Sequence, residues 1–507
     1  MPAKIVPCYF SPSVDNAWSV APGALTGLQN FAPLQIGAYG SMGVATPSGF
    51  SGIADLDFLK GKMFRQVAGT VRLLMFRPGN IDEYDNAGTK TNRGTGYNAA
   101  TANWEAAAWG NQIIACNYLD ATQSSTGAGF AGLGGGSPKA RYVAANQDFV
   151  ILADVDDSGS NVFSDMVWWC GLRNPATWTP AIATQAGNIR LLGAPGPIRN
   201  VVAFRGGFVV FKDNSMFMGT YVGPPPNGFI FDWTMISNRI GLIAPDAVAE
   251  LDGKLYFLHS SGFYEFDGQT IRNIGMPVYQ QFGVETGYFV NPNQGPVIGA
   301  GDGIAKTQTV ADDIDGIVWF QSNITIAGTH PFLFYGYNPR TQRWGRGQLA
   351  GGGVGSGFSK LIVANFADIN AFLSGRTADR FWVVANGAAA SSIQAVQYPV
   401  ATAAGVQAYY ITGLVGSREG SSTSLRHHWR TLNGTTADSA VAVTINGYSS
   451  ETKLIANGTA TGAVNTEFDY ADVLISSRFK TATVQFSVGK VTILAGIGFD
   501  EQPGGRR

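Results

Sequence analysis

Residues 205–275 read RGGFVVFKDNSMFMGTYVGPPPNGFIFDWTMISNRIGLIAPDAVAELDGKLYFLHSSGFYEFDGQTIRNIG. Short apolar and aromatic runs alternate here with turns of Gly, Asp and Asn. In the clearest unit, Asp252-Gly253 leads into LYFL, Ser261-Gly262 turns back into FYEF, and Asp267 begins the next turn. Runs of about four to six β-branched or aromatic residues between Asp-Gly turns are the strongest short-range signal of a β-hairpin. The stretch therefore predicts consecutive antiparallel strands joined by tight turns.

The same unit recurs along the chain. A turn leads into a strand-like run at Asn111 (NQIIAC), Gln147 (QDFVIL), Gly206 (GGFVVF), Asp252 (DGKLYF), Asp315 (DGIVWF) and Asp379 (DRFWVV). Most of these runs are followed by a second aromatic run, as in MVWWCGL, SMFMGTYV, GFYEF and FLFYGYN. Repeats of roughly 40–50 residues with several strands each are typical of β-propeller blades. We therefore expect an all-β fold, a β-propeller with six or seven irregular blades, and a pair of large β-sandwiches is the alternative.

Changes in composition predict three parts. Residues 1–50 are rich in Pro, Gly, Ala and Ser with scattered aromatics, and their low charge argues against a solvated tail, so we expect an extended N-terminal arm that packs on another body. Residues 51–390 carry the recurring unit and should form the propeller. Residues 391–507 lose aromatics and gain Thr, Ala and Val in alternation, which predicts a C-terminal antiparallel β-sandwich or platform domain.

The overall composition limits the classes of function. The chain has 507 residues, 66 of them Gly, and only 14% are charged, against roughly 25% in ordinary globular chains. Low charge suits surfaces that are covered by neighbouring subunits. The net charge is −1, with 34 basic and 35 acidic side chains, which disfavours tight binding of DNA through its phosphates. A surface that DNA slides past remains compatible with these numbers.

The cysteines and the hydropathy pattern bear on the compartment. Cys8, Cys116 and Cys170 are odd in number and widely spaced, which is neither a disulfide framework nor a zinc motif. The N-terminus lacks the apolar core of a signal peptide, and nowhere do about 18 apolar residues run together. We therefore expect reduced cysteines, assembly in a cytoplasm and no membrane span.

One acidic motif superficially fits a calcium loop. It runs from Asp154 to Asp165, with Gly159 at the sharp turn. The flanking runs FVILA and MVWWC predict strands rather than the helices of an EF-hand, so a solvated turn between two strands is favoured. Asp312, Asp313 and Asp315 also cluster, before the run IVWF, where Asp is a routine turn former.

Other candidate groups have simple readings as well. His427 and His428 are adjacent, and neighbouring residues of a strand point to opposite faces, so they would not share a metal ion. The glycines of LGGGS (133–137) lack the Lys-Ser/Thr of a phosphate-binding loop, so flexibility is expected there. With four histidines in all and no carboxylate pair flanked by aromatics, we predict no catalytic residue, no cofactor and no metal site. The chain is not expected to be an enzyme.

Several phrases together resemble a known family. They are WGNQII (109–114), PKARYV (138–143), DFVILADVD, VWWCGLRNPATWT, GGFVVFKDNSMFMGTYVGPP, IGLIAPDAVAELDGKLYFLHSSGFYEFDGQTIRNIG and the final Gly-Arg-Arg. The chain resembles the tail nozzle, or tail-hub, proteins of short-tailed bacteriophages, also called packaged-DNA stabilisation proteins. The resemblance is densest over 104–285, weak before residue 50 and looser in the C-terminal part. Its phrases carry no catalytic residue over to this sequence.

The resemblance implies a structural protein of the virion tail, assembled in the host cytoplasm. Such proteins form a ring, typically of six copies, below the portal and adaptor proteins and next to tail fibre or tailspike proteins. The ring prolongs the channel through which double-stranded DNA leaves and helps to retain the packaged genome without binding it tightly. The arm at 1–50 would then pack on a neighbouring ring. Arg173, Arg199 and Arg239 could touch phosphate, although salt-bridge or interface roles are favoured for each.

Two other classes stay open. A carbohydrate-binding, depolymerising or receptor-binding tail propeller would need an exposed cleft of aromatic and carboxylate groups, whereas the tryptophans here lie inside strand-like runs. A monomeric propeller scaffold that recruits peptides would not form a ring.

Overall fold

The computed structural model describes two groups of residues. In the N-terminal and central part these are 6–7, 9–10, 12, 24–55, 57–159, 162–223, 230–286, 307–323, 332–349, 360–386 and 391–398. In the C-terminal part they are 408–412, 422–430, 440–448, 454–465, 470–479, 481–488, 493–494 and 496–503. The fold is nearly all-β, as expected, and two α-helices are found among these residues, α1 (Met276–Glu285) and α3 (Phe366–Phe372).

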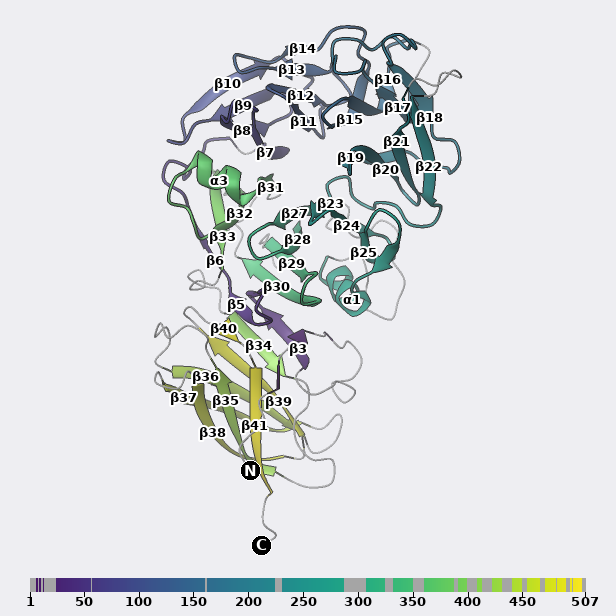
Figure 1. Ribbon diagram of the computed structural model, residues 1–507. Coiled ribbons are helices and arrows are strands. Elements are labelled where there is room, and N and C mark those ends of the chain that lie inside the picture. Colours follow the sequence, from purple (N-terminus) through teal and green to yellow (C-terminus); the bar gives the residue numbers. More distant parts are fainter. Residues whose placement is uncertain are drawn as a thin grey trace.

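Four-stranded antiparallel units are arranged around a common centre (Figure 1). Within the described residues there are seven, so the expected β-propeller is confirmed with seven blades. Five are β7–β10 (Lys60–Arg65, Val71–Phe76, Asn80–Tyr84, Lys90–Thr95), β11–β14 (Glu105–Trp109, Gln112–Cys116, Gln123–Ser125, Ala131–Gly132), β15–β18 (Lys139–Ala145, Val150–Asp156, Val162–Trp169, Gly187–Arg190), β19–β22 (Ile198–Phe204, Gly207–Lys212, Met216–Tyr221, Phe231–Ser237) and β23–β26 (Val248–Leu251, Lys254–His259, Gly262–Phe266, Ile271–Asn273). The sixth is β27–β30 (Gln308–Asp312, Ile317–Asn323, Phe332–Asn338, Arg343–Leu349), and the seventh consists of β31–β33 (Lys360–Val363, Asp379–Asn386, Ser391–Gln397) with β6 (Gly43–Ala45).

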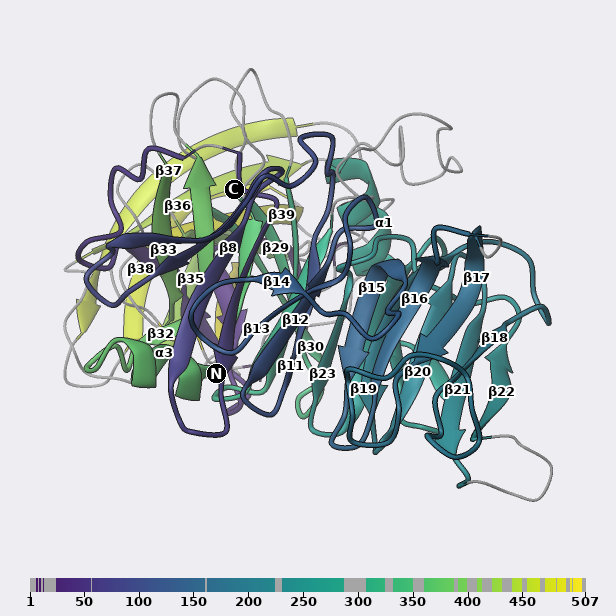
Figure 2. The same cartoon turned by 90° about the horizontal axis from the view of Figure 1, so that it is seen from above.

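The recurring sequence unit is the second strand of a blade. The six predicted runs correspond to β12, β16, β20, β24, β28 and β32, and the aromatic runs that follow four of them are third strands. The hairpin at 252–268 is also confirmed, because Leu255 of β24 pairs with Phe266 of β25. Asp252 and Gly253 both have positive φ, 51° and 71°, as a two-residue turn between twisted strands requires. Figure 2 shows the strands of successive blades lengthwise.

An N-terminal strand closes the propeller. β6 pairs antiparallel with β33, so it forms the outer strand of the last blade, while β31 pairs in parallel with β7 of the first blade. Gly61 of β7 lies at this second contact, and a Cβ on it would be 2.8 Å from Ile362 Cγ1. First and last blades are therefore joined directly into one eight-stranded sheet.

The expected arm at 1–50 is wrong for its second half. β4 (Phe31–Pro33) pairs with β30 and with β5 (Tyr39–Ser41), and β3 (Ala24–Gln29) pairs with β34 (Ala408–Thr412). The physical reason is that three-residue strands such as β4 and β5 carry no readable periodicity, while the partners β30 and β34 lie hundreds of residues away along the chain. The expected boundaries at 50 and 390 do not separate domains either, since the last blade combines Gly43–Ala45 with Ser391–Gln397.

The C-terminal strands form a ten-stranded sheet below the propeller (Figure 1). Its order is β1 (Val6–Pro7), β41 (Gly496–Pro503), β35 (Ser422–Arg430), β38 (Tyr470–Phe479), β37 (Leu454–Asn465), β36 (Ala440–Tyr448), β39 (Thr481–Val488), β34, β3 and β2 (Tyr9–Phe10). β37 pairs with β36 up to Ala463 and with β38 only at Val464 and Asn465, so this long strand passes from one half of the sheet to the other. β40 (Ile493–Leu494) pairs with β5 and links this domain to the sixth blade.

Aromatic side chains fill the spaces between blades. Trp104, Trp178, Trp319 and Trp382 are fully buried, and so is Phe50 from the expected arm. The Phe50 ring contacts Tyr84 of the first blade and Trp382 of the last, with centroids 6.4 and 5.8 Å apart. Burying a side chain of this size contributes about 1.5–3 kcal/mol, so packing reinforces the closure made by β6.

Candidate functional site

The first strands of all seven blades surround a cavity of about 460 Å³ on the propeller axis. Most of its wall is small and apolar, including Ala107 and Ala108 from β11 and Val201 and Val202 from β19. Charged side chains also face it, among them Lys60, Glu105 and Asp246. Charged groups in a buried setting are expensive unless they are paired, so the axis is where chemistry or a structural network should be sought.

Lys60 connects three blades across the axis. Its side chain is 5% exposed and comes from β7. The Lys60 Nζ atom donates to Glu105 Oε2 of β11 and lies 2.6 Å from Oδ1 of Asp246, which precedes β23. The Lys62 Nζ atom lies beside this group, 3.6 Å from Glu105 Oε1, and donates to the Ala106 carbonyl oxygen at 2.6 Å.

Two more blades join through Asp246. The Gln308 Nε2 atom of β27 donates to Asp246 Oδ2 at 3.3 Å, and Gln308 Oε1 accepts from the Leu361 amide of β31 at 2.8 Å. The Thr309 amide donates to the Asp246 carbonyl oxygen at 2.9 Å. The network thus links five blades, four through their first strands and one through Asp246 just before β23.

The electrostatics favour a structural role for this network. Burial alone would lower the pKa of Lys60, but the carboxylates of Asp246 and Glu105 outweigh it and raise that pKa. Burial is the main cause that lowers the pKa of Lys62. An amine whose pKa is raised stays protonated and is a poor nucleophile or base. Lys60 is therefore suited to holding blades together.

A second cavity of about 470 Å³ lies at the end of the axis where the first strands begin. We call it the rim cavity. Its walls come from residues at or just before the starts of β11, β15, β19, β23 and β27, and from Tyr118, Asp154 and Ser164. Asp246 borders both cavities. Arg141 and Arg199 line the rim cavity from the neighbouring strands β15 and β19.

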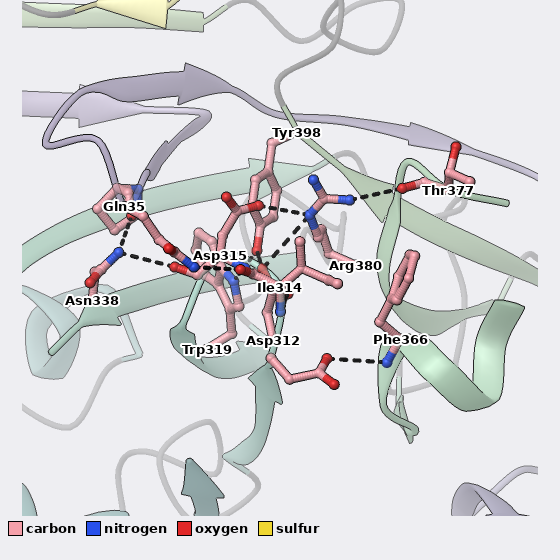
Figure 3. A network of polar contacts seen from close by, with 12 residues as sticks. Gln35, Asp312, Ile314, Asp315, Trp319, Asn338, Phe366, Thr377, Arg380 and Tyr398 are labelled. Atoms are coloured by element: carbon pink, nitrogen blue, oxygen red, sulfur yellow. Dashed lines mark hydrogen bonds and ion pairs between the residues drawn. The ribbon is translucent and has the colours of Figure 1, made fainter. Parts of the chain in front are cut away.

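A third polar group ties the sixth blade to the seventh (Figure 3). The fully buried Asp312 ends β27 and accepts a hydrogen bond from the Tyr398 hydroxyl, which itself accepts from Trp319 Nε1 at 2.9 Å. The Arg380 Nε atom of β32 lies 2.8 Å from Asp315 Oδ2 and 3.9 Å from Asp312 Oδ2. The N-terminal segment also reaches this group, because Gln35 Nε2 donates to the Ile314 carbonyl oxygen.

Desolvation places the titration of Asp312 close to neutrality. Burial raises its pKa to about 6, and the Asp315 charge adds to the rise, while Tyr398 and Arg380 oppose it. The expected role of the aspartates in this turn is confirmed, since the Ile314 amide donates to Asp312 Oδ1 at 3.0 Å. The buried link to Tyr398 was not foreseen.

The calcium-like motif is split between two ion pairs. Asp154 Oδ2 lies 2.7 Å from Arg141 Nε, whereas Asp165 Oδ1 lies 2.9 Å from Arg190 Nε. The predicted turn between two strands is confirmed by β16 and β17. Within the described ranges, no three His, Cys, Asp or Glu side chains gather in a way that could hold a metal ion.

The remaining candidate residues from the sequence have ordinary structural positions. Arg173 and Arg199 form ion pairs within the chain, with Asp148 and Asp213, while the structure gives only a backbone hydrogen bond for Arg239, from its amide to Ser237 Oγ. His427 and His428 lie on strand β35 as expected. Cys116 and Cys170 are free and buried, whereas Cys8 lies outside the described residues.

Flexibility was the wrong expectation for LGGGS. Gly134, Gly135 and Gly136 all have positive φ in a tight turn, and a Cβ on Gly135 would be 1.7 Å from the Ala176 carbonyl oxygen. The close approach of two backbones therefore requires glycine there.

Sequence reasoning missed Lys60, Glu105, Asp246 and Arg141. The available signal was a charged residue inside an apolar strand, as in KGKMF and KARYV. Such a residue is costly to bury and therefore indicates a partner, but the partners lie up to 186 residues away along the chain.

Comparisons with known proteins leave the family open. No family model and no curated protein matches the chain. Among solved structures, virginiamycin B lyase from Staphylococcus aureus is similar with 8% identity and a TM-score of 0.39, covering 70% of this chain and 99% of the lyase. The sialidase of Trypanosoma rangeli, solved with the inhibitor DANA, is similar with 10% identity and a TM-score of 0.33, covering 91% of this chain and 97% of the sialidase. In the part of the chain that the structure describes, no helix is long and apolar enough to cross a membrane.

Proposed function

We propose that this chain is a structural subunit of a virion tail, which assembles with further copies into the nozzle ring of a short-tailed bacteriophage. The ring, of about six copies in proteins of the resembling family, would sit below the portal and adaptor proteins, prolong the DNA-ejection channel and help to retain the genome. Tail fibre or tailspike proteins would attach nearby. The chain would act by shape and rigidity, with no chemical step.

The observation that carries this proposal is how the resembling phrases map onto the fold. The region of about 104–285 covers four consecutive blades, β11–β14, β15–β18, β19–β22 and β23–β26, and its phrases run from Trp109 to Gly275. A similarity spread over several successive blades is one between structural units. It supports a related body, and it carries no reacting group.

The closure of the chain suits a part that has to stay rigid under force. The first and last blades share one sheet, and β3 and β40 connect the propeller region to the C-terminal strands from both ends of the chain. Neither domain can move far without breaking strand pairing. Local unfolding of the kind seen in mobile elements is therefore costly at this junction. A channel that must withstand packed DNA would require such rigidity.

The axial cavity of one propeller is too small and too crossed by side chains to serve as a DNA channel. The Lys60 network spans the propeller axis with three paired charges, and the space around it is about 460 Å³. That volume is of the size of a small-molecule pocket. In a ring, DNA would therefore pass between copies and not through one propeller.

A test uses particles that lack this protein. We expect them to package DNA and then lose it, and to retain it again when the purified chain is added back. The chain with Phe50→Ala, which opens the blade closure, should restore retention less well than the chain with Ile36→Ala, an exposed position. Particles that keep their genome without the protein but fail to attach to cells would instead support a receptor-binding role.

A further inference from the structure

Two arginines on neighbouring blades face the rim cavity in the same way. Arg141 is the third residue of β15 and Arg199 is the second residue of β19. Each uses its Nε atom in an ion pair with an aspartate of its own blade, Asp154 on β16 and Asp213 directly after β20. Both guanidinium groups remain partly accessible, with 43% and 40% of the side chain exposed. All of these residues belong to one chain, so the cavity does not require ring assembly.

Local backbone distortions position these pairs. Asp154 has φ 54° at a register shift between β16 and β17, and Arg199 lies in a register shift between β19 and β20. Such bulges change the direction of a side chain, and they are more frequent next to functional sites than elsewhere in sheets. Tyr118 has φ 71°, and its ring centre lies 4.4 Å from Arg141 Cζ. Arg141 is thus fixed by a carboxylate at its Nε atom and by an aromatic face.

The two arginines and Tyr142 leave hydrogen-bond donors available at the rim cavity. In the described part of the chain, the terminal nitrogens of Arg141 and Arg199 donate no hydrogen bond, so their N–H groups are left for a ligand. Tyr142, between the two arginines in sequence order, is 2% exposed and lines the cavity, yet its hydroxyl has no hydrogen-bond partner in the described ranges. The Tyr142 oxygen is not closed off from the cavity, so water can satisfy it in the free chain and a ligand oxygen can take the place of that water.

We propose that the rim cavity binds a compact oxyanionic group, a carboxylate or a phosphate monoester of a small ligand, between Arg141 and Arg199 with the Tyr142 hydroxyl as a further donor. The planar fork of an arginine matches the oxygens of both groups. Asp154 and Asp213 balance the charges of the two arginines, and Asp246 adds a further carboxylate to the wall, so selection comes from donor geometry and not from net charge. Asn103 and Ser164, also in the wall, can contact the rest of the ligand.

Calorimetric titration of the full chain with sodium glucuronate, sodium phosphate and glucose tests this site. We expect saturable binding of at least one anion and none of glucose. Binding of glucuronate alone would indicate a carboxylate ligand, and binding of phosphate alone would indicate a phosphate ester. Binding of both would indicate that the site recognises the oxyanion that they share. No saturable binding of either anion, or glucose binding as tightly, would overturn the proposal.

Variants separate the site from general effects of charge. Arg199→Gln should weaken anion binding about tenfold or more, and Arg199→Lys should not restore it fully because an ammonium lacks the fork. Arg173→Gln is the matched control, since Arg173 is also an exposed arginine paired through Nε with an aspartate, at 2.7 Å, but is not part of the cavity wall. Equal weakening by Arg173→Gln would contradict the assignment.

Tyr142→Phe gives the sharpest readout. Because the hydroxyl has no partner in the free chain, its removal should leave the unfolding temperature unchanged while binding weakens about threefold or more. Unchanged binding in this variant together with unchanged binding in Arg199→Gln would exclude the site.

Discussion

Lys60 of β7 and Asp246, which precedes β23, meet across the propeller axis with 2.6 Å between Nζ and Oδ1. Glu105 completes the group from a third blade. The ion pairs therefore lie where the blades converge, and the account of this protein as a rigid body depends on them.

Removing the lysine should be costly. Lys60→Met leaves Glu105 and Asp246 facing each other in a buried space, and breaking a buried ion pair typically costs about 3–5 kcal/mol. We expect a loss of that order in the free energy of unfolding, measured with guanidinium chloride. The exposed pair of Arg173 and Asp148 is the control, and Arg173→Gln should cost less than about 1 kcal/mol. Similar losses in both variants would contradict a structural role of the axial network.

Phe50 tests whether the segment before residue 51 belongs to the propeller. Phe50 is fully buried against the first and last blades, so Phe50→Ala should cost about 3–5 kcal/mol. Ile36 is 65% exposed, and Ile36→Ala should change stability by less than about 0.5 kcal/mol. Thermal unfolding of both variants measures the difference. An unchanged transition in Phe50→Ala would mean that residue 50 belongs to a free arm after all.

Asp312 should make the protein less stable as pH rises. Its pKa is about 6 in the folded chain against an ordinary value of 3.8, so the folded state holds the proton more tightly between these values. Stability from this group is full below about pH 4 and is lost as pH rises to 6, by about 3 kcal/mol. The side chain in Asp312→Asn cannot titrate. The difference in free energy of unfolding between wild type and this variant should therefore change by that amount between pH 4 and pH 7. A constant gap across this range would refute the raised pKa.

His259 should act in the opposite direction. Burial lowers its pKa to about 4 from 6.5, and its Nε2 atom faces Asn214 Oδ1 at 3.2 Å while Nδ1 faces Ser261 Oγ at 2.8 Å. Below pH 6.5 the unfolded chain takes up a proton that the folded chain refuses, so stability falls as pH drops to 4, by about 3 kcal/mol. In His259→Gln this part of the acid sensitivity should disappear, as urea unfolding at several pH values would show. Acid sensitivity equal to that of the wild type would exclude His259 as its source.

The sequence allowed prediction of the local pairs and failed for the distant ones. Asp252-Gly253 and the runs after it are readable because turn and strands are contiguous, and the same holds for the other second strands that the repeat identified, although it missed β8. β6 could not be foreseen, since three residues joined to Ser391–Gln397 leave no periodic pattern. The polar clusters were hidden for the same reason, because Lys60 and Asp246 or Asp312 and Tyr398 become neighbours only when the blades close into a ring. The recurring runs that begin at positions 111, 147, 206, 252, 315 and 379 predicted the propeller, and only its closure fixed the blade number at seven.

Mass photometry of the purified chain, alone and with the matching portal–adaptor complex, tests the central claim most directly. A single chain has a mass of 53.6 kDa, so a ring of six copies adds 6 × 53.6, about 320 kDa, to the complex. The account predicts a discrete increase that corresponds to one ring of about six copies and does not grow further with excess protein. A chain that stays monomeric and leaves the mass of the complex unchanged would contradict the nozzle proposal.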